Sequence, residues 1–97
     1  MSFWVYILRC ADESYYTGHT DDLERRMGEH QSGLVKGYTQ TRLPVELAWS
    51  QEFATRDEAK KSEGRIKGWS RAKKQALIDG RWDRISALAR GKNRHER

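Results

Sequence analysis

The sequence predicts a mixed α/β (α+β) domain in which helices flank one three-stranded antiparallel sheet. An aromatic and β-branched apolar run opens the chain, a second extended segment follows it closely, and two helix-capping patterns appear downstream. The expected order of elements is β-β-α-β-α-α. One sheet covered by helices is the economical way to bury both kinds of element.

The first two strands are predicted to form a hairpin. Residues 3–10 (FWVYILRC) are almost continuously apolar, as in a strand that is buried on both faces. Residues 11–13 break the pattern and residues 14–17 resume it, so the second strand is expected to end at Gly18. The turn contains no glycine, and Glu13 is a poor choice there if the turn requires a positive φ.

A first helix is predicted over residues 22–31. Residues 20–22 (Thr-Asp-Asp) supply candidate N-caps, and Glu24 lies three residues after Asp21, as a capping box requires. Gly33 is expected to end the helix.

The middle of the chain is predicted to contain a loop, a strand and a second helix. Residues 34–44 are expected to be a loop because a glycine and the only proline lie within them. Residues 45–53 alternate well enough for a third strand, and residues 55–58 (TRDE) form a capping box for a helix over residues 56–68. Gly64 inside this helix costs about 1 kcal/mol relative to alanine.

Two further helices are expected towards the C-terminus. Ser70 can cap a third helix, and residues 83–89 form a last short one. We expect residues 1–80 to form the domain, and residues 81–97 to add a helix and a basic tail that pack on it or trail it.

Charge and composition bound the possible functions. The net charge is +5 and the isoelectric point is about 9.6, which favours a polyanionic partner such as nucleic acid but equally fits a solvated basic surface. Cys10 is the only cysteine, so the chain forms no internal disulfide. No apolar run reaches membrane length. A reducing, cytoplasmic setting without membrane contact is therefore expected.

An arginine falls on the apolar face of the first predicted helix. Leu23, Met27 and His30 define the inward stripe, and Arg26 lies on it, whereas Arg25 points away. An unpaired buried guanidinium is very costly, so Arg26 must snorkel, pair with an acid, or face a phosphate in a cleft.

A glutamate repeats this anomaly on the second helix. Ala59, Ser62 and Ile66 mark the inward stripe, and Glu63 falls on it. A salt bridge between Arg26 and Glu63 would satisfy both charges. A site with a phosphate beside Arg26 and a divalent cation on Glu63 would do so as well, and the spacing does not separate the two.

Together, the ordered motifs of the chain resemble those of the GIY-YIG nuclease family. The resemblance covers residues 3–77, implies the GIY-YIG fold, and is closest to the small stand-alone bacterial proteins of this superfamily. Its motifs are residues 4–6 (WVY), residues 16–18 (YTG), the helix with Thr20, Leu23, Glu24, Arg26 and His30, Glu63, and the segments "YT…R.PVEL" and "IK.WSRAKK".

The chain departs from the family pattern at several positions. The first tripeptide lacks its glycine, and Thr17 replaces the usual aliphatic residue of the second. His19 stands where some relatives have a lysine. Asn93, the only asparagine, lies in the tail, so the role of a further asparagine in larger relatives is not transferred.

The resemblance implies hydrolysis of a phosphodiester by water, assisted by one Mg²⁺ or Mn²⁺ ion. Glu63 would hold the metal, and Arg26 would clamp the phosphate. Tyr6 would act as general base, with its phenol pKa lowered by the metal and Arg26, and Tyr16 would position the water or phosphate. The other candidate bases are His19 and His30.

Two of these residue types also have ordinary structural explanations. Strand tyrosines such as Tyr6 and Tyr16 usually pack in a core or at an edge. His30 is equally well explained as a hydrogen-bonded core histidine.

Cations and aromatic residues around the motifs suggest binding of nucleic acid, DNA rather than RNA. The candidates are Lys36, Tyr38, Arg42, Lys67, Trp69, Arg71, Lys73 and Lys74. Trp69 could instead be a core anchor, and residues 71–74 a solvated face.

The expected function is a metal-dependent endonuclease that cuts single-stranded or structured DNA in repair, recombination or DNA processing. Such a small domain has little area for reading a long duplex sequence. The alternatives are a silent nucleic-acid-binding module and a nuclease that needs a protein partner for targeting.

Overall fold

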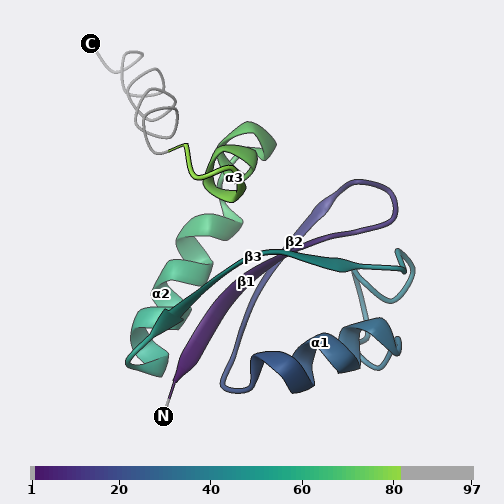
Figure 1. The fold of residues 1–97 in the computed structure, drawn as a ribbon, viewed down its shortest axis with the longest axis horizontal. Coiled ribbons are helices and arrows are strands. Elements are labelled where there is room, and N and C mark those ends of the chain that lie inside the picture. Colours follow the sequence, from purple (N-terminus) through teal and green to yellow (C-terminus); the bar gives the residue numbers. More distant parts are fainter. Residues whose placement is uncertain (1, 82–97) are drawn as a thin grey trace.

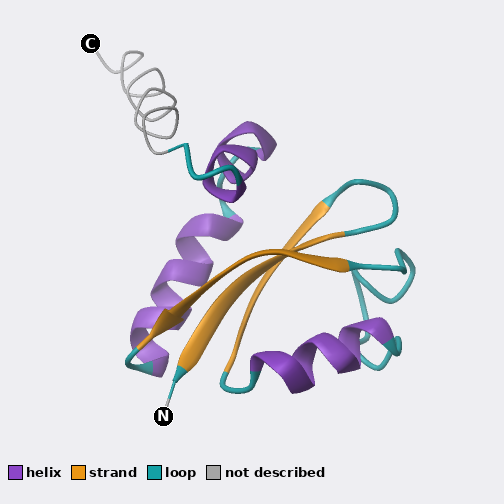
Figure 2. Cartoon of the chain, in the orientation of Figure 1, coloured by secondary structure: helices purple, strands orange, loops and turns teal. Residues whose placement is uncertain are grey.

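The computed structural model describes residues 2–81, which form one antiparallel sheet with helices on both faces. The strands are β1 (Phe3–Arg9), β2 (Tyr15–Thr20) and β3 (Glu46–Phe53). Their order in the sheet is β2-β1-β3, so β1 is central and pairs with both neighbours (Figures 1 and 2). The predicted fold class and order of elements are confirmed.

The helices separate two cores on opposite faces of β1. Helix α1 (Leu23–Gln31) covers the face on which Tyr6 and Leu8 lie. Helices α2 (Arg56–Lys67) and α3 (Arg71–Ile78) cover the face of Val5 and Ile7 (Figure 1). These four consecutive residues of β1 are all buried, which explains why its sequence is continuously apolar.

Each of the three described helices begins where a side chain accepts a hydrogen bond from one of its first backbone N–H groups. Thr55 caps α2 and exchanges hydrogen bonds with Glu58, so the predicted capping box is confirmed. For α1 the N-cap is Asp22, one of the three candidates, so the capping box that was counted from Asp21 is wrong by one residue. Asp22 accepts the hydrogen bond from the Arg25 N–H at 3.1 Å, while Asp21 pairs with arginine side chains instead.

The hairpin has the strained turn that the sequence suggested, but its second strand is longer than expected. Glu13 has a φ of 67°, the strained conformation that its turn position suggested. Strand β2 runs to Thr20 rather than ending at Gly18, because Gly18 stands opposite Tyr6 in the ladder and continues the pairing. Because Gly18 has no side chain, the Tyr6 ring can lie directly over it.

The long loop between α1 and β3 has no regular element, as predicted. It returns to the hairpin turn, where the Ala11 N–H donates to the Arg42 carbonyl at 2.9 Å, so the two connections lie at the same end of the sheet (Figure 2). The predicted helix over residues 83–89 and the tail beyond it lie outside the described residues. Within residues 2–81 no helix is long and apolar enough to cross a membrane.

The packing over Gly18 makes a testable prediction about stability. A Cβ atom at this residue would lie 2.5 Å from the Tyr6 hydroxyl oxygen, so Gly18→Ala should lower the free energy of unfolding by about 1–3 kcal/mol. Gly64→Ala is the matched control: a Cβ there meets nothing within 4 Å, and the change should stabilise α2 by about 0.5–1 kcal/mol. Urea denaturation measures the free energy of unfolding of both variants. Equal effects of the two substitutions would contradict the close contact between Gly18 and Tyr6.

Candidate functional site

The Tyr6 side chain forms the centre of the candidate site. It lies in the central strand, is 1% exposed, and its ring passes over Gly18 of the edge strand β2. A buried hydroxyl must find hydrogen-bond partners. Those partners come from α1 and from the loop that follows it.

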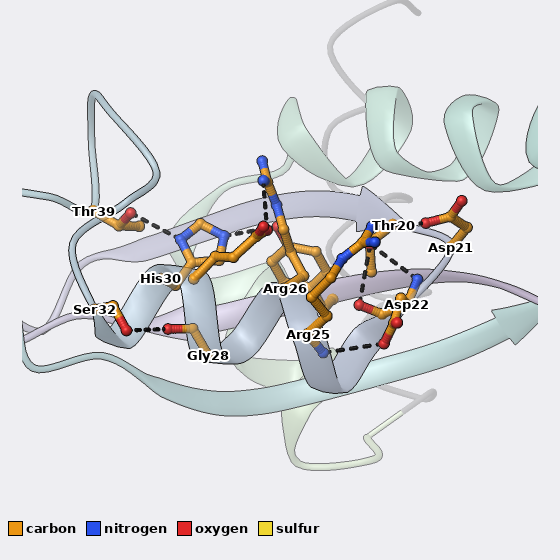
Figure 3. Close-up of polar contacts among 11 residues, drawn as sticks. Thr20, Asp21, Asp22, Arg25, Arg26, Gly28, His30, Ser32 and Thr39 are labelled. Carbon is orange, nitrogen blue, oxygen red and sulfur yellow. Dashed lines mark hydrogen bonds and ion pairs between the residues drawn. The ribbon is translucent and has the colours of Figure 1, made fainter.

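A chain of hydrogen bonds joins Tyr6 to the long loop through His30. The Tyr6 hydroxyl lies 2.9 Å from His30 Nε2, and His30 Nδ1 lies 2.9 Å from Thr39 Oγ1 (Figure 3). His30 and Thr39 are both buried. His30 is therefore a buried, hydrogen-bonded histidine, and one of its two partners is the candidate catalytic tyrosine.

Arg26 reaches the same hydroxyl from one turn earlier on α1. Its guanidinium pairs with Glu29 at 3.2 Å, and its interaction with the Tyr6 hydroxyl raises the pKa of Arg26. Glu63 pairs with His19 instead, so the direct bridge between Arg26 and Glu63 considered from the sequence is not formed. Arg26 remains about one-third exposed, which leaves part of its guanidinium accessible from solvent.

The pKa of Tyr6 differs from the sequence-based expectation. Burial raises this pKa to about 12, although the hydrogen bond and the charge of Arg26 act to lower it. Arg26 alone therefore does not produce the predicted lowering, because desolvation of the phenolate outweighs the guanidinium, and the part assigned to the metal ion stays a prediction. Tyr6 is a neutral proton donor near pH 7.

The pKa of His30 is lowered, first by burial and then by the charge of Arg26. A neutral imidazole has one donor and one acceptor nitrogen. Arg26 can only donate, so the Tyr6 oxygen accepts from it and the Tyr6 O–H donates to His30 Nε2. The Nδ1–H of His30 then donates to Thr39 Oγ1, so Tyr6, His30 and Thr39 each have a hydrogen-bond partner.

Glu63 and His19 lie on the other face of the edge strand. Glu63 projects from α2, and its Oε2 atom lies 2.9 Å from His19 Nδ1 on β2. Their side chains are 17% and 25% exposed, respectively. The charge of Glu63 contributes to raising the pKa of Tyr6, so its carboxylate is within electrostatic range of the hydroxyl.

Tyr16 completes the group on the α1 face. Its ring centroid lies 5.4 Å from that of His30 and 6.4 Å from that of Tyr6, in edge-to-face and tilted arrangements. The structure thus brings together the six predicted catalytic residues around the edge strand: Tyr6, Tyr16, His19, Arg26, His30 and Glu63.

Metal binding has to rely on few protein ligands. Within residues 2–81 no three side chains of His, Cys, Asp or Glu gather closely enough to form a cage. The partly exposed carboxylate of Glu63 is nevertheless a suitable hard oxygen ligand, since Mg²⁺ usually keeps several waters and takes one or two carboxylates together with substrate phosphate. Glu63 therefore fits a hydrated divalent ion.

Part of the predicted binding surface adjoins this site. The Tyr38 ring stacks on Tyr16 at 6.1 Å, and the Arg42 guanidinium lies 3.8 Å above Tyr38. Asp12 and the Tyr38 carbonyl fix Arg42 by hydrogen bonds of 2.9 Å each. Tyr38 is 40% exposed and Lys36 is exposed, so this loop offers an aromatic and cationic surface beside the candidate catalytic residues.

The remaining predicted binding residues lie on the opposite face. Trp69 packs against the core under α2 and α3, and the Lys73 ammonium lies 4.3 Å over its ring. Arg71 lies over Tyr15 at 4.7 Å. Burial, together with nearby Lys67, lowers the pKa of Lys74. The structure does not bring this second group, which consists of Lys67, Trp69, Arg71, Lys73 and Lys74, onto the α1 face.

Sequence reasoning missed three residues that shape the site. Gly18 admits the Tyr6 ring, Thr39 fixes His30, and Glu29 orients Arg26. Glu29 could have been found, because it lies three residues after Arg26 on one helix face. A loop has no period that would place Thr39 against a helix nine residues earlier, so the signal that could have found it is the segment "YT…R.PVEL", in which it follows Tyr38.

The chain belongs to the GIY-YIG family. The family described as "GIY-YIG catalytic domain" matches residues 2–76. Domains of this family are nuclease-like: they act on nucleic acid and generally depend on a divalent metal ion.

Within this family the chain is similar to the UPF0213 proteins. It is 47% identical over 75 residues to UPF0213 protein NP_0776A of Natronomonas pharaonis, covering 77% of this chain and 88% of the relative. A UPF0213 protein of Bacillus pumilus is 46% identical over 76 residues, covering 78% of each.

Two solution NMR structures share the fold. The UPF0213 protein BH0048 of Bacillus halodurans aligns with a TM-score of 0.54 and 42% identity, over 81% of this chain and 84% of its own. Protein EF2693 of E. faecalis aligns with a TM-score of 0.57 and 38% identity, over 82% and 85%.

The lowered pKa of His30 predicts how stability depends on pH. Because folding lowers this pKa below its ordinary value of about 6.5, the unfolded chain takes up the proton first as pH falls. The contribution of His30 to the free energy of unfolding should therefore be constant above about pH 6.5 and should decrease as pH falls towards the folded pKa. Urea denaturation across this range, with an NMR titration of the His30 ring, measures both quantities. His30→Gln should remove this part of the slope, and an unchanged slope would contradict the assignment.

Proposed function

We propose that this protein is a metal-dependent endonuclease that hydrolyses phosphodiester bonds in DNA. The observation that supports it best is the group around one buried hydroxyl: Arg26 and His30 contact Tyr6 directly, and Glu63 lies within electrostatic range of it. A structural core has no need for a phenol, a guanidinium, an imidazole and a carboxylate together. Residues 1–80 would carry this activity.

Each side chain has a role in the proposed reaction. Water attacks phosphorus, the bond to the sugar oxygen breaks, and that oxygen leaves as a hydroxyl with a proton taken from solvent. The guanidinium of Arg26 stabilises the charge on the phosphate oxygens. Tyr6 takes a proton from the water as its own proton passes to Nε2 of His30, which is neutral and correctly oriented. Tyr16 packs against this pair and orients the phosphate or water. A divalent ion on Glu63 would supply positive charge and polarise the phosphate.

The relay resolves the problem that the high pKa of Tyr6 creates. A phenol with a pKa of about 12 is a poor base while its proton has no acceptor. His30 provides that acceptor 2.9 Å away, and Thr39 holds the imidazole in the tautomer that accepts. Tyr6 and His30 then act as one unit and are no longer alternative general bases.

Single-stranded or structured DNA is the proposed substrate class. The described part of the chain presents a short cationic and aromatic surface, Lys36 with Tyr38 and Arg42, beside the site. Aromatic rings next to cations suit unpaired bases and the adjoining backbone. Extensive reading of duplex sequence normally buries a larger surface. Roles in repair, recombination or DNA processing are consistent with such a substrate.

Cleavage assays with matched variants test the activity. Wild-type protein should cut labelled single-stranded, duplex or branched DNA in the presence of Mn²⁺ or Mg²⁺. Tyr6→Phe should reduce the rate about 10²–10⁴-fold and Arg26→Ala about 10²–10³-fold, and Glu63→Ala should abolish metal-dependent cleavage. Arg25→Ala and Asp57→Ala, which remove exposed charges from the same two helices, should cut like wild type.

The same assay separates the rival functions. DNA binding without cleavage by wild type, unchanged in Glu63→Ala, would identify a silent binding module and contradict the nuclease proposal. Cleavage that appears only when a second protein is added would identify a partner-dependent nuclease.

The loop surface makes a separate prediction about binding. Tyr38→Ala should weaken binding of single-stranded DNA by about 1–3 kcal/mol through lost base stacking, without loss of the fold. Trp69→Ala should instead destabilise the fold, since Trp69 packs against the core. Fluorescence anisotropy with urea denaturation measures both. Weaker binding in folded Trp69→Ala, with normal binding in Tyr38→Ala, would reverse the assignment of the surface.

A further inference from the structure

His19 occupies a position from which it can reach whatever Glu63 holds. It follows Gly18 on β2, and its ring lies on the α2 face, away from the Tyr6, His30 and Thr39 chain. Its Nδ1 atom lies 2.9 Å from Oε2 of Glu63. Both side chains remain partly exposed, so an ion from solvent can reach the pair.

The distance between these two atoms matches the edge of an octahedral coordination sphere. Ligand atoms about 2.1 Å from a metal and at right angles to each other are separated by about 3.0 Å. A tetrahedral site with similar bonds would place them about 3.4 Å apart. The observed 2.9 Å therefore lets a six-coordinate ion take the place of the shared proton without a change in the positions of β2 and α2.

We propose that His19 is a second protein ligand of the metal, so that Glu63 and His19 form a mixed oxygen and nitrogen site. This inference rests on the proposed function, in which Glu63 holds the ion. Imidazole nitrogen suits transition metals, whereas Mg²⁺ prefers oxygen and water. The consequence is that this chain should favour Mn²⁺ over Mg²⁺ more strongly than a site with Glu63 alone would.

The competing explanation is that the pair is only a hydrogen bond. In that case His19 orients the Glu63 carboxylate from outside the coordination sphere, and the metal is bound by oxygen atoms alone. The two arrangements differ in whether a nitrogen atom touches the ion, which can be measured without any activity assay.

Electron spin echo envelope modulation of Mn²⁺ on the full chain makes that measurement. The wild-type spectrum should contain ¹⁴N couplings from a directly bound imidazole. These should disappear in His19→Gln, whose amide keeps a hydrogen-bonding group beside Glu63. Calorimetry should show Mn²⁺ binding weakened at least about 10-fold in His19→Gln, and Mg²⁺ binding weakened less. Circular dichroism confirms that the variants are folded.

The outcomes distinguish this inference from the proposed function. Mn²⁺ that binds wild type without ¹⁴N coupling, with equal affinity in His19→Gln but not in Glu63→Gln, would overturn the role of His19 and leave the nuclease proposal intact. Mn²⁺ binding that is unchanged in Glu63→Gln would overturn both. Loss of the coupling in His19→Gln, with binding abolished in Glu63→Gln, would support the two-ligand site.

Discussion

The buried hydroxyl of Tyr6 is the constraint on which the rest of the structure depends. Strand β1 is covered on both faces, and Tyr6 places a polar group inside one of the two cores. Leaving that group without a partner would cost about 1–3 kcal/mol. Arg26 and His30 satisfy it from α1, and Thr39 satisfies His30 in turn. One hydrogen-bonded chain thus connects the central strand, the first helix and the long loop.

The same chain explains why a loop without regular structure has a defined position. Thr39 is 1% exposed although it lies in the middle of that loop. Its carbonyl accepts from the Arg42 N–H at 3.0 Å, and the Arg42 carbonyl accepts from the hairpin turn. Arg42 then lies over Tyr38, which lies over Tyr16. The polar core and the proposed binding surface are therefore parts of one assembly.

Sequence reasoning reached the elements because these depend on local patterns, whereas the candidate catalytic residues came from the resemblance to the GIY-YIG family. The apolar run of β1, the capping box of Thr55 and Glu58, and Ser70 as the cap of α3 all follow from periodicity and short-range hydrogen bonds. It did not reach quantities that depend on distant packing. The pKa of Tyr6 is set by how much of the fold covers it, and Glu63 finds its partner His19 on another element, 44 residues away in the sequence.

Because β2 lies at the edge of the sheet, side chains from both of its faces could act in the proposed reaction. Tyr6, Arg26 and His30 lie on the α1 face, whereas Glu63 and His19 lie on the α2 face, and β2 runs between them. Groups on opposite faces of an inner strand could not reach a common phosphate, because the neighbouring strands would separate them. Strand β2 has no neighbour on its outer side in the sheet, and Gly18 lets the Tyr6 hydroxyl extend over it. A backbone phosphate at this edge would meet the guanidinium of Arg26 from one side and a cation held by Glu63 from the other, so that both positive charges could act on one phosphate in the proposed reaction.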